Sequence, residues 1–146
     1  MKKHKSPKTL VLSTVETGFS SVATVLRSGF NLMGIVGLHP KKANLQTVSG
    51  YADVSNFAKE MKIPHWYVED YSLRNEVDRR LLLSLDFDLI WVAGWQRLIP
   101  EWLIEKSPMG AIGGHGSPDG ISGGRGRSPQ NWALILGCKS FDLALF

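Results

Sequence analysis

The chain has 146 residues, the size of one domain, and its 43% hydrophobic and 21% charged residues are typical of globular proteins. These values exclude a disordered, collagenous or coiled-coil chain. The net charge of +4 comes from the N-terminus, where Lys2, Lys3, Lys5 and Lys8 supply four of the 17 basic residues and leave 13 against 13 acidic ones. We therefore predict a basic flexible tail over residues 1–8 and a neutral body, which argues against nucleic acid as a partner.

The expected compartment is the cytoplasm. No apolar run reaches the roughly 18 to 20 residues that a membrane span needs, and the N-terminal MKKHKSPK lacks the apolar stretch of a secretory signal. The single cysteine, Cys138, cannot form an internal disulfide or a thiolate metal cage. The sequence therefore predicts a cytoplasmic protein with no membrane partner and no bound metal.

Strand and helix patterns alternate along the body of the chain. Short apolar, β-branched runs predict strands, and hydrophobic residues at helical spacing predict helices. In chain order the expected elements are a strand at residues 9–14; a helix containing Val22, Val25 and Leu26, with Ser20 or Ser21 as N-cap and Gly29 as its end; a strand at 32–38; a helix at 54–62 after Asp53; a strand at 65–68; a helix at 75–85; a strand at 88–94; a short helix opened by Pro100; a brief strand at 110–114; and a helix at about 129–136 between Ser128 and Gly137.

This alternation predicts an α/β fold. Strand-helix-strand units connect in a right-handed sense and build a doubly wound, mostly parallel sheet whose site lies at the carboxyl ends of the strands. The loops that begin at Gly94 and Gly113 are therefore expected at the functional edge. A final alternating run, FDLALF at residues 141–146, predicts one more strand. Because the chain stops inside this run, we expect the domain at residues 9–146 to be incomplete.

The most unusual segment is GGHGSPDGISGGRGRSP, residues 113–129, which has seven glycines in 17 residues. Glycines permit close ligand approach, but neither GxGxxG nor GxxxxGK[ST] occurs here, which argues against the familiar phosphate loops. His115 can donate a proton or stabilise an oxyanion, and Arg125 and Arg127 can hold an anionic group. A histidine in such a loop is also often a plain surface residue, and composition leaves that alternative open.

Three blocks carry a resemblance by their order and spacing: FAKEMKIP at residues 57–64, DLIWVAGWQRLIP at 88–100, and residues 110–137. With them the chain resembles the folate-dependent formyltransferase family over nearly its whole length. The run RGRSPQNWALILG at 125–137 looks most like the branch that acts on nucleotide-linked aminosugars. The resemblance implies a Rossmann-like formyltransferase N-terminal domain that transfers a formyl group from N10-formyltetrahydrofolate to a primary amine, here the amine of a nucleotide-aminosugar.

The resemblance also implies roles for particular residues. His115 matches the catalytic histidine of the family. A loop whose backbone holds the pteridine ring and a pocket for the amine substrate are expected as well. The cofactor-binding residues are then Trp95, Gln96, Arg97, Leu98 and Ile99, and the substrate-binding residues are Ser117, Arg125, Gly126 and Asn131.

The chain departs from the family pattern beside the histidine. Gly113 stands where the family has a catalytic asparagine, extra residues precede Arg125, and the family's catalytic aspartate lies beyond residue 146. One oxyanion donor is typically worth about 2.7 to 4 kcal/mol. Two alternatives therefore stay open, a methionyl-tRNA formyltransferase-like protein and a degenerate folate-binding domain without catalysis. Self-association as a homodimer is also left open.

Overall fold

The computed structural model describes residues 6–43, 48–123, 126 and 128–146. These form two compact units, Met1–Ala111 and Ile112–Phe146, which are described separately below. Residues 1–5 of the predicted tail lie outside the described part. The last tail residue, Lys8, is held by the body: its backbone amide donates to the Asp88 carboxylate at 2.8 Å, and its ammonium group pairs with Asp86.

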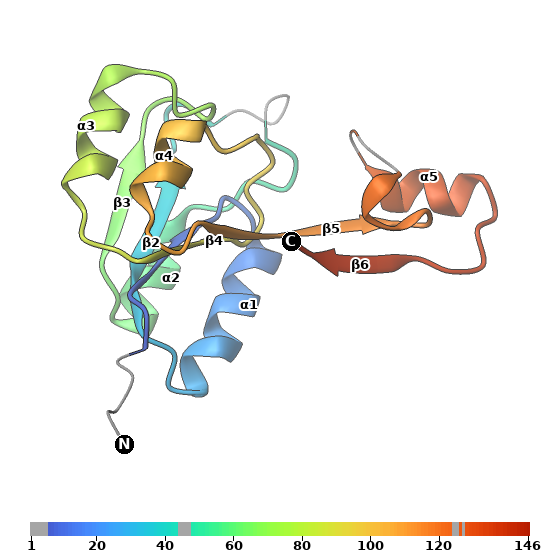
Figure 1. The fold of residues 1–146 in the computed structure, drawn as a ribbon, viewed down its shortest axis with the longest axis horizontal. Helices are drawn as coiled ribbons and strands as arrows, with labels where there is room; N and C mark the ends of the chain where they lie inside the picture. The colour runs from blue at the N-terminus through green and yellow to red at the C-terminus, as the bar shows by residue number, and fades with distance from the viewer. Residues whose placement is uncertain (1–5, 44–47, 124–125, 127) are drawn as a thin grey trace. The chain divides into compact units, whose positions relative to one another are not determined.

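The first unit contains a parallel sheet with the strand order β3-β2-β1-β4. This confirms the predicted α/β fold, and Figure 1 shows how the helices surround these strands. The elements of the unit are β1 (Thr9–Leu12), α1 (Glu16–Arg27), β2 (Leu32–Leu38), α2 (Val54–Met61), β3 (His65–Val68), α3 (Glu76–Ser84), β4 (Leu89–Val92) and α4 (Glu101–Lys106).

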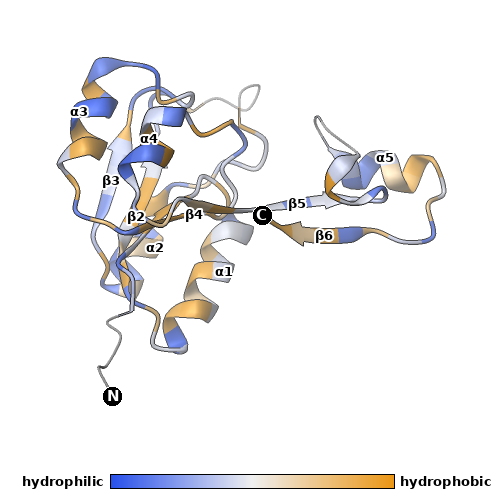
Figure 2. Cartoon of the chain, in the orientation of Figure 1, coloured by the Kyte–Doolittle hydropathy of each residue, from blue (hydrophilic) through white to orange (hydrophobic). Residues whose placement is uncertain are grey.

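Helices cover both faces of this sheet, so the unit is doubly wound. Leu10 and Leu12 of β1 face a core shared with α3 and α4, whereas Val11 faces a second core shared with α1 and α2. All three side chains are completely buried. A strand that is covered on both faces needs apolar residues at every position, which explains the continuous apolar runs in the sequence. A helix is covered on one side only, and Figure 2 accordingly shows both hydrophilic and hydrophobic residues around the turns of α3.

The start of α1 differs from the sequence prediction. The helix begins at Glu16 rather than after Ser20 or Ser21, whose hydroxyls donate to backbone carbonyls one turn earlier. Phe19 lies on the first turn and is buried in the core, so packing rather than side-chain capping sets where this helix begins. The predicted end is confirmed, because Gly29 adopts a positive φ of 78° directly after the C-cap.

The second unit contains β5 (Ala111–Ser117, whose first residue belongs to the first unit), a short 3₁₀ turn η1 (Gly120–Ser122), α5 (Pro129–Ile135) and β6 (Asp142–Leu145). Strands β5 and β6 are antiparallel, with Gly114 opposite Leu145 and Ser117 opposite Asp142. Strand β5 is therefore longer than the predicted brief strand at 110–114. Pairing with β6 extends it through residues whose glycine-rich sequence has little strand propensity of its own.

Within the described part of the chain, no helix is both long enough and apolar enough to cross a lipid bilayer.

Candidate functional site

The loop after β4 leaves the sheet through a position that requires glycine. Gly94 has a φ of +87°, and a Cβ atom there would lie 2.4 Å from the Val15 side chain at the start of α1. The five predicted cofactor-binding residues follow directly. Trp95 is buried, Arg97 and Ile99 are half-buried, and Gln96 and Leu98 are exposed, with Leu98 at 93%.

A chain of hydrogen bonds through the Tyr71 hydroxyl fixes the first part of this loop. The Gln96 amide donates to the Tyr71 hydroxyl at 2.8 Å, and this hydroxyl lies 3.1 Å from Oγ1 of Thr14. Thr14 in turn donates to the Gly94 carbonyl at 3.2 Å, so Tyr71 donates to Thr14 and every hydroxyl hydrogen has an acceptor. The segment after β1, the turn after β3 and the loop after β4 are thereby tied together.

The turn after β3 forms the opposite wall and is built around two carboxylates. Asp70 accepts hydrogen bonds from the Ser72 amide, the Ser72 hydroxyl and the Arg74 amide, at 2.7–2.9 Å. Asp78 of α3 is almost fully buried, and its carboxylate accepts from the backbone amides of Glu69 and Asp70. These bonds fold the turn so that Ser72 and Arg74 both line a pocket.

The hydrogen bonds also change the acidity of Asp70. Partial burial raises the pKa of this carboxyl, but the donors of Ser72 and Arg74 stabilise the charged form and hold the pKa below its usual value. The turn is therefore built around an ionised carboxylate. Leu73, between Ser72 and Arg74, is completely buried and adopts a positive φ of 56°, a conformation that costs a non-glycine residue about 1 kcal/mol or more.

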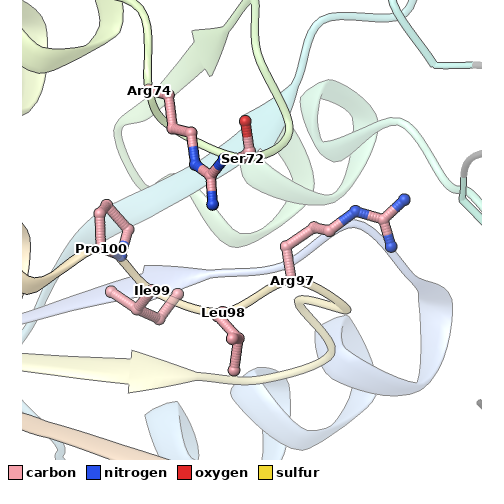
Figure 3. A pocket seen from close by; sticks show the side chains of 6 residues that line it. All are labelled: Ser72, Arg74, Arg97, Leu98, Ile99 and Pro100. Atoms are coloured by element: carbon pink, nitrogen blue, oxygen red, sulfur yellow. The ribbon is translucent and has the colours of Figure 1, made fainter. Parts of the chain in front are cut away.

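The pocket between these walls has a volume of about 320 Å³ and opens to solvent (Figure 3). In Figure 3 the Arg74 side chain extends from the turn toward the 97–100 segment, whereas the Arg97 guanidinium points away from Arg74. The Arg97 guanidinium carbon lies 5.1 Å from the centre of the Tyr71 ring. The lining combines the Arg74 guanidinium with a serine and apolar surface, which suits an anionic and partly apolar ligand. Its residues are Ser72, Arg74, Arg97, Leu98, Ile99 and Pro100.

Trp95 adds an unusual feature to this loop. The residue is only 6% exposed, and its indole Nε1 has no hydrogen-bond partner among the described residues. Buried donors are rarely left unpaired, because each costs about 1 to 3 kcal/mol. The nitrogen itself is buried in the core, and Trp95 is not among the residues that line the pocket, so this unpaired donor is a local energetic cost of the loop.

In the second unit, His115 lies within β5 opposite Ala144 rather than after the strand end. Its Nε2 atom is 2.9 Å from the Gly123 carbonyl oxygen. Because a carbonyl only accepts hydrogen bonds, Nε2 carries the proton and donates, which in the neutral ring makes Nδ1 the accepting nitrogen. The side chain is half-buried. Its orientation is thus fixed by a backbone contact within its own unit.

Three of the four predicted substrate-binding residues, Ser117, Gly126 and Asn131, lie among the described residues of the second unit. Ser117 is completely buried, and its hydroxyl accepts from the Asp119 amide at 3.0 Å, as expected of a turn-forming serine. Gly126 is exposed, with a φ of +120°, and Asn131 is exposed on α5. Arg125 lies outside the described residues. The role of these four residues in substrate binding stays a prediction.

Sequence reasoning missed Ser72 and Arg74, which line one side of the pocket, and the buried Tyr71 beside them. The available signal was Asp70 followed two residues later by a serine at the end of a predicted strand, a pattern typical of a side-chain-stabilised turn. The turn and the loop after β4 lie at the same edge of the parallel sheet, because each follows the carboxyl end of a strand.

No family model matches the chain. Its sequence is 27% identical over 117 residues to a methionyl-tRNA formyltransferase from Koribacter versatilis (strain Ellin345), which covers 80% of this chain and 36% of that protein. Among solved structures, it resembles a phosphoribosylglycinamide formyltransferase from Anaplasma phagocytophilum, with a TM-score of 0.73, 21% identity, and coverage of 97% of this chain and 64% of the other. A formyltetrahydrofolate deformylase from Burkholderia mallei ATCC 23344 gives a TM-score of 0.73 and 18% identity, covering 97% and 48%.

The similarities establish the fold and cover only part of the length of each relative. The fold is the Rossmann-like α/β fold of the two solved enzymes, as the sequence predicted. The chain spans about a third of the length of the methionyl-tRNA formyltransferase and about half of the deformylase. The aminosugar branch, predicted from residues 125–137, is not supported by these similarities.

Proposed function

We propose that this chain belongs to the formyltransferase family and transfers a formyl group from N10-formyltetrahydrofolate to a primary amine. The observation that carries the proposal is the pocket at the carboxyl edge of the sheet, between the loop after β4 and the turn after β3. The resemblance implies a folate-binding loop at residues 95–99, and three of these residues, Arg97, Leu98 and Ile99, line the pocket. The relatives supply the reaction class, since two of the three that we compared are formyltransferases.

The residues of the pocket fit the chemistry of a formylated folate. Such a donor has a flat ring with polar edges, an apolar aromatic linker and a tail with carboxylate groups. The backbone of the loop at Arg97, Leu98 and Ile99 lies at the pocket and offers hydrogen bonds to the ring. Leu98 and Ile99 offer apolar surface, and Arg74 offers a guanidinium for a carboxylate. The donor would supply the formyl carbon, and the chain's residues would hold and orient it.

His115 is the proposed catalytic residue. Attack of an amine on a formyl carbon places negative charge on the formyl oxygen, and a hydrogen-bond donor or a cation stabilises this charge. Because Nε2–H donates to the Gly123 carbonyl, the neutral ring has no second N–H, so His115 would stabilise this charge as a cation or after its Nε2–H leaves Gly123. Protonation at Nδ1 would convert the ring to a cation while this bond is kept. This role follows from the family motif and the side-chain chemistry.

The amine is proposed to belong to a nucleotide-linked aminosugar, because residues 125–137 resemble that branch of the family. The sequence relative favours methionyl-tRNA instead. The two are separated by supplying each amine, at equal concentration, with a donor that carries a radiolabelled formyl group. Label recovered only on the sugar supports the first substrate, and label recovered only on the charged tRNA replaces it with the second. Label on neither amine would overturn both.

Gly113 favours a second candidate function, folate binding without efficient transfer. Its backbone pairs with Phe146 in both directions, and no side-chain donor is present two residues before His115. A Cβ atom at Gly113 would lie 3.4 Å from the Phe146 ring, which is ordinary contact, so a Cβ atom meets no clash there. We expect Gly113→Asn to raise the transfer rate by up to about 10² to 10³-fold. An unchanged rate with intact folate binding would support the binding-only function.

A further inference from the structure

Tyr71 lies where the turn after β3 contacts the loop after β4. The residue is 6% exposed, and its ring packs edge-on against Trp95 with the ring centres 4.7 Å apart. The Arg97 guanidinium covers the same ring at 5.1 Å. Tyr71 belongs to the turn that carries Ser72 and Arg74, yet its side chain contacts the first three residues of the opposite loop.

The Tyr71 hydroxyl acts on the loop through the backbone of Gln96. Residues 94–97 form no helix or strand, so hydrogen bonds from outside the loop set the direction of their peptide groups. The Gln96 amide donates to the Tyr71 hydroxyl, whose own hydrogen is directed to Thr14. Hydrogen bonds aligned in such a chain polarise and strengthen one another. The orientation of the Gln96 peptide is thereby linked to the segment after β1.

We propose that Tyr71 is a positioning residue for the formyl donor: its hydroxyl fixes the Gln96 peptide, so that the loop presents its polar groups to the donor in one arrangement. This inference rests on the proposed function, because it assumes that the donor binds this loop. The role belongs to the hydroxyl, since a phenylalanine would keep the ring contacts with Trp95 and Arg97. Tyr71 is not a catalytic residue, because it acts through Gln96.

The test compares Tyr71→Phe with Tyr67→Phe. Tyr67 also loses a hydroxyl hydrogen bond, to Asp53, but it packs against the core with α1 and α2 on the other face of the sheet. The probes are 5-formyltetrahydrofolate and 5-formyltetrahydropterin, which lacks the carboxylate tail, and affinity is measured by calorimetry. We expect Tyr71→Phe to bind both probes about tenfold more weakly, a change of about 1.4 kcal/mol. Tyr67→Phe should stay within about twofold of the unaltered chain.

A second arm separates this effect from loss of the tail contact. Arg74→Gln should weaken binding of the folate probe and leave the pterin probe unchanged, because only the folate carries carboxylates. In the ligand-free protein, hydrogen exchange at the Gln96 amide should become at least about tenfold faster in Tyr71→Phe and stay unchanged in Tyr67→Phe. Thr14→Val, which removes the next link of the chain, should speed this exchange as well.

The outcomes separate failure of the proposed function from failure of the proposed role of Tyr71. If the unaltered chain binds neither probe, the proposed function fails and the role of Tyr71 fails with it. If the unaltered chain binds and Tyr71→Phe behaves like Tyr67→Phe in affinity and exchange, the proposed function stands and the role of Tyr71 is overturned. Weaker binding together with faster exchange at Gln96 supports both.

Discussion

Asp78 offers a direct test of how the pocket is built. The carboxylate is 1% exposed and accepts hydrogen bonds from the Glu69 amide at 2.9 and 3.1 Å and from the Asp70 amide at 2.8 Å. A hydrogen bond to a charged group contributes about 1.5 to 3 kcal/mol. In Asp78→Asn, one carboxylate oxygen is replaced by an NH₂ group. This group cannot accept a hydrogen bond from the backbone amides of Glu69 and Asp70, and it repels them. We therefore expect a loss of about 2 to 4 kcal/mol in the free energy of unfolding.

Urea unfolding followed by far-ultraviolet circular dichroism measures this loss, with Glu76→Gln as the control. Glu76 lies on the same helix and pairs with Arg80 at 3.3 Å, but both side chains are exposed, so its loss should cost less than about 0.5 kcal/mol. The turn carries Arg74, so Asp78→Asn should also weaken binding of 5-formyltetrahydrofolate. If the two variants unfold at the same urea concentration, the buried carboxylate does not hold the turn and the reasoning is wrong.

Two further predictions concern the other titratable groups. The pKa of Asp70 is depressed, so its carboxylate stabilises the fold above the unfolded value near 3.9 and loses this effect as the pH falls through the lower native pKa. Asp70→Asn should therefore be less stable than the unaltered chain near neutral pH and approach it on acidification, and a constant difference in urea midpoints from about pH 7 to about pH 2 would contradict this. His115→Ala should abolish formyl transfer and lower the free energy of unfolding by less than about 1.5 kcal/mol, since it removes one hydrogen bond from a half-buried side chain. A much larger loss of stability would make His115 a structural residue.

Much of the fold could be predicted because its signals are local. The limits of β2 and β3 match the prediction to the residue, and Asp53 caps α2 as expected, accepting from the Ser55 amide. The predicted limits are wrong where contacts between residues distant in the sequence determine the start or end of an element. Burial of Phe19 extends α1 toward its N-terminus, and pairing with β6 lengthens β5 through its glycines. Neither effect is visible in a window of neighbouring residues.

The candidate site was predictable in part. The loop after β4 follows from the sheet topology and from the family motif, and the structure places it beside a pocket. The second wall could not be predicted, because Tyr71 and Arg74 meet this loop through contacts about 25 residues apart in sequence. His115 was expected after a strand and lies inside one, since its setting depends on β6.

The central claim is that this chain moves a formyl group from a folate to an amine. The most direct test incubates the chain with N10-formyltetrahydrofolate carrying a ¹³C-formyl group and with a nucleotide-linked aminosugar, and follows the label by ¹³C nuclear magnetic resonance. The account predicts that the label leaves the donor and appears as a formamide on the sugar, at a rate abolished by His115→Ala. Label that stays on the donor both with the sugar and, in a parallel sample, with methionyl-tRNA, or that appears only as free formate, would contradict it.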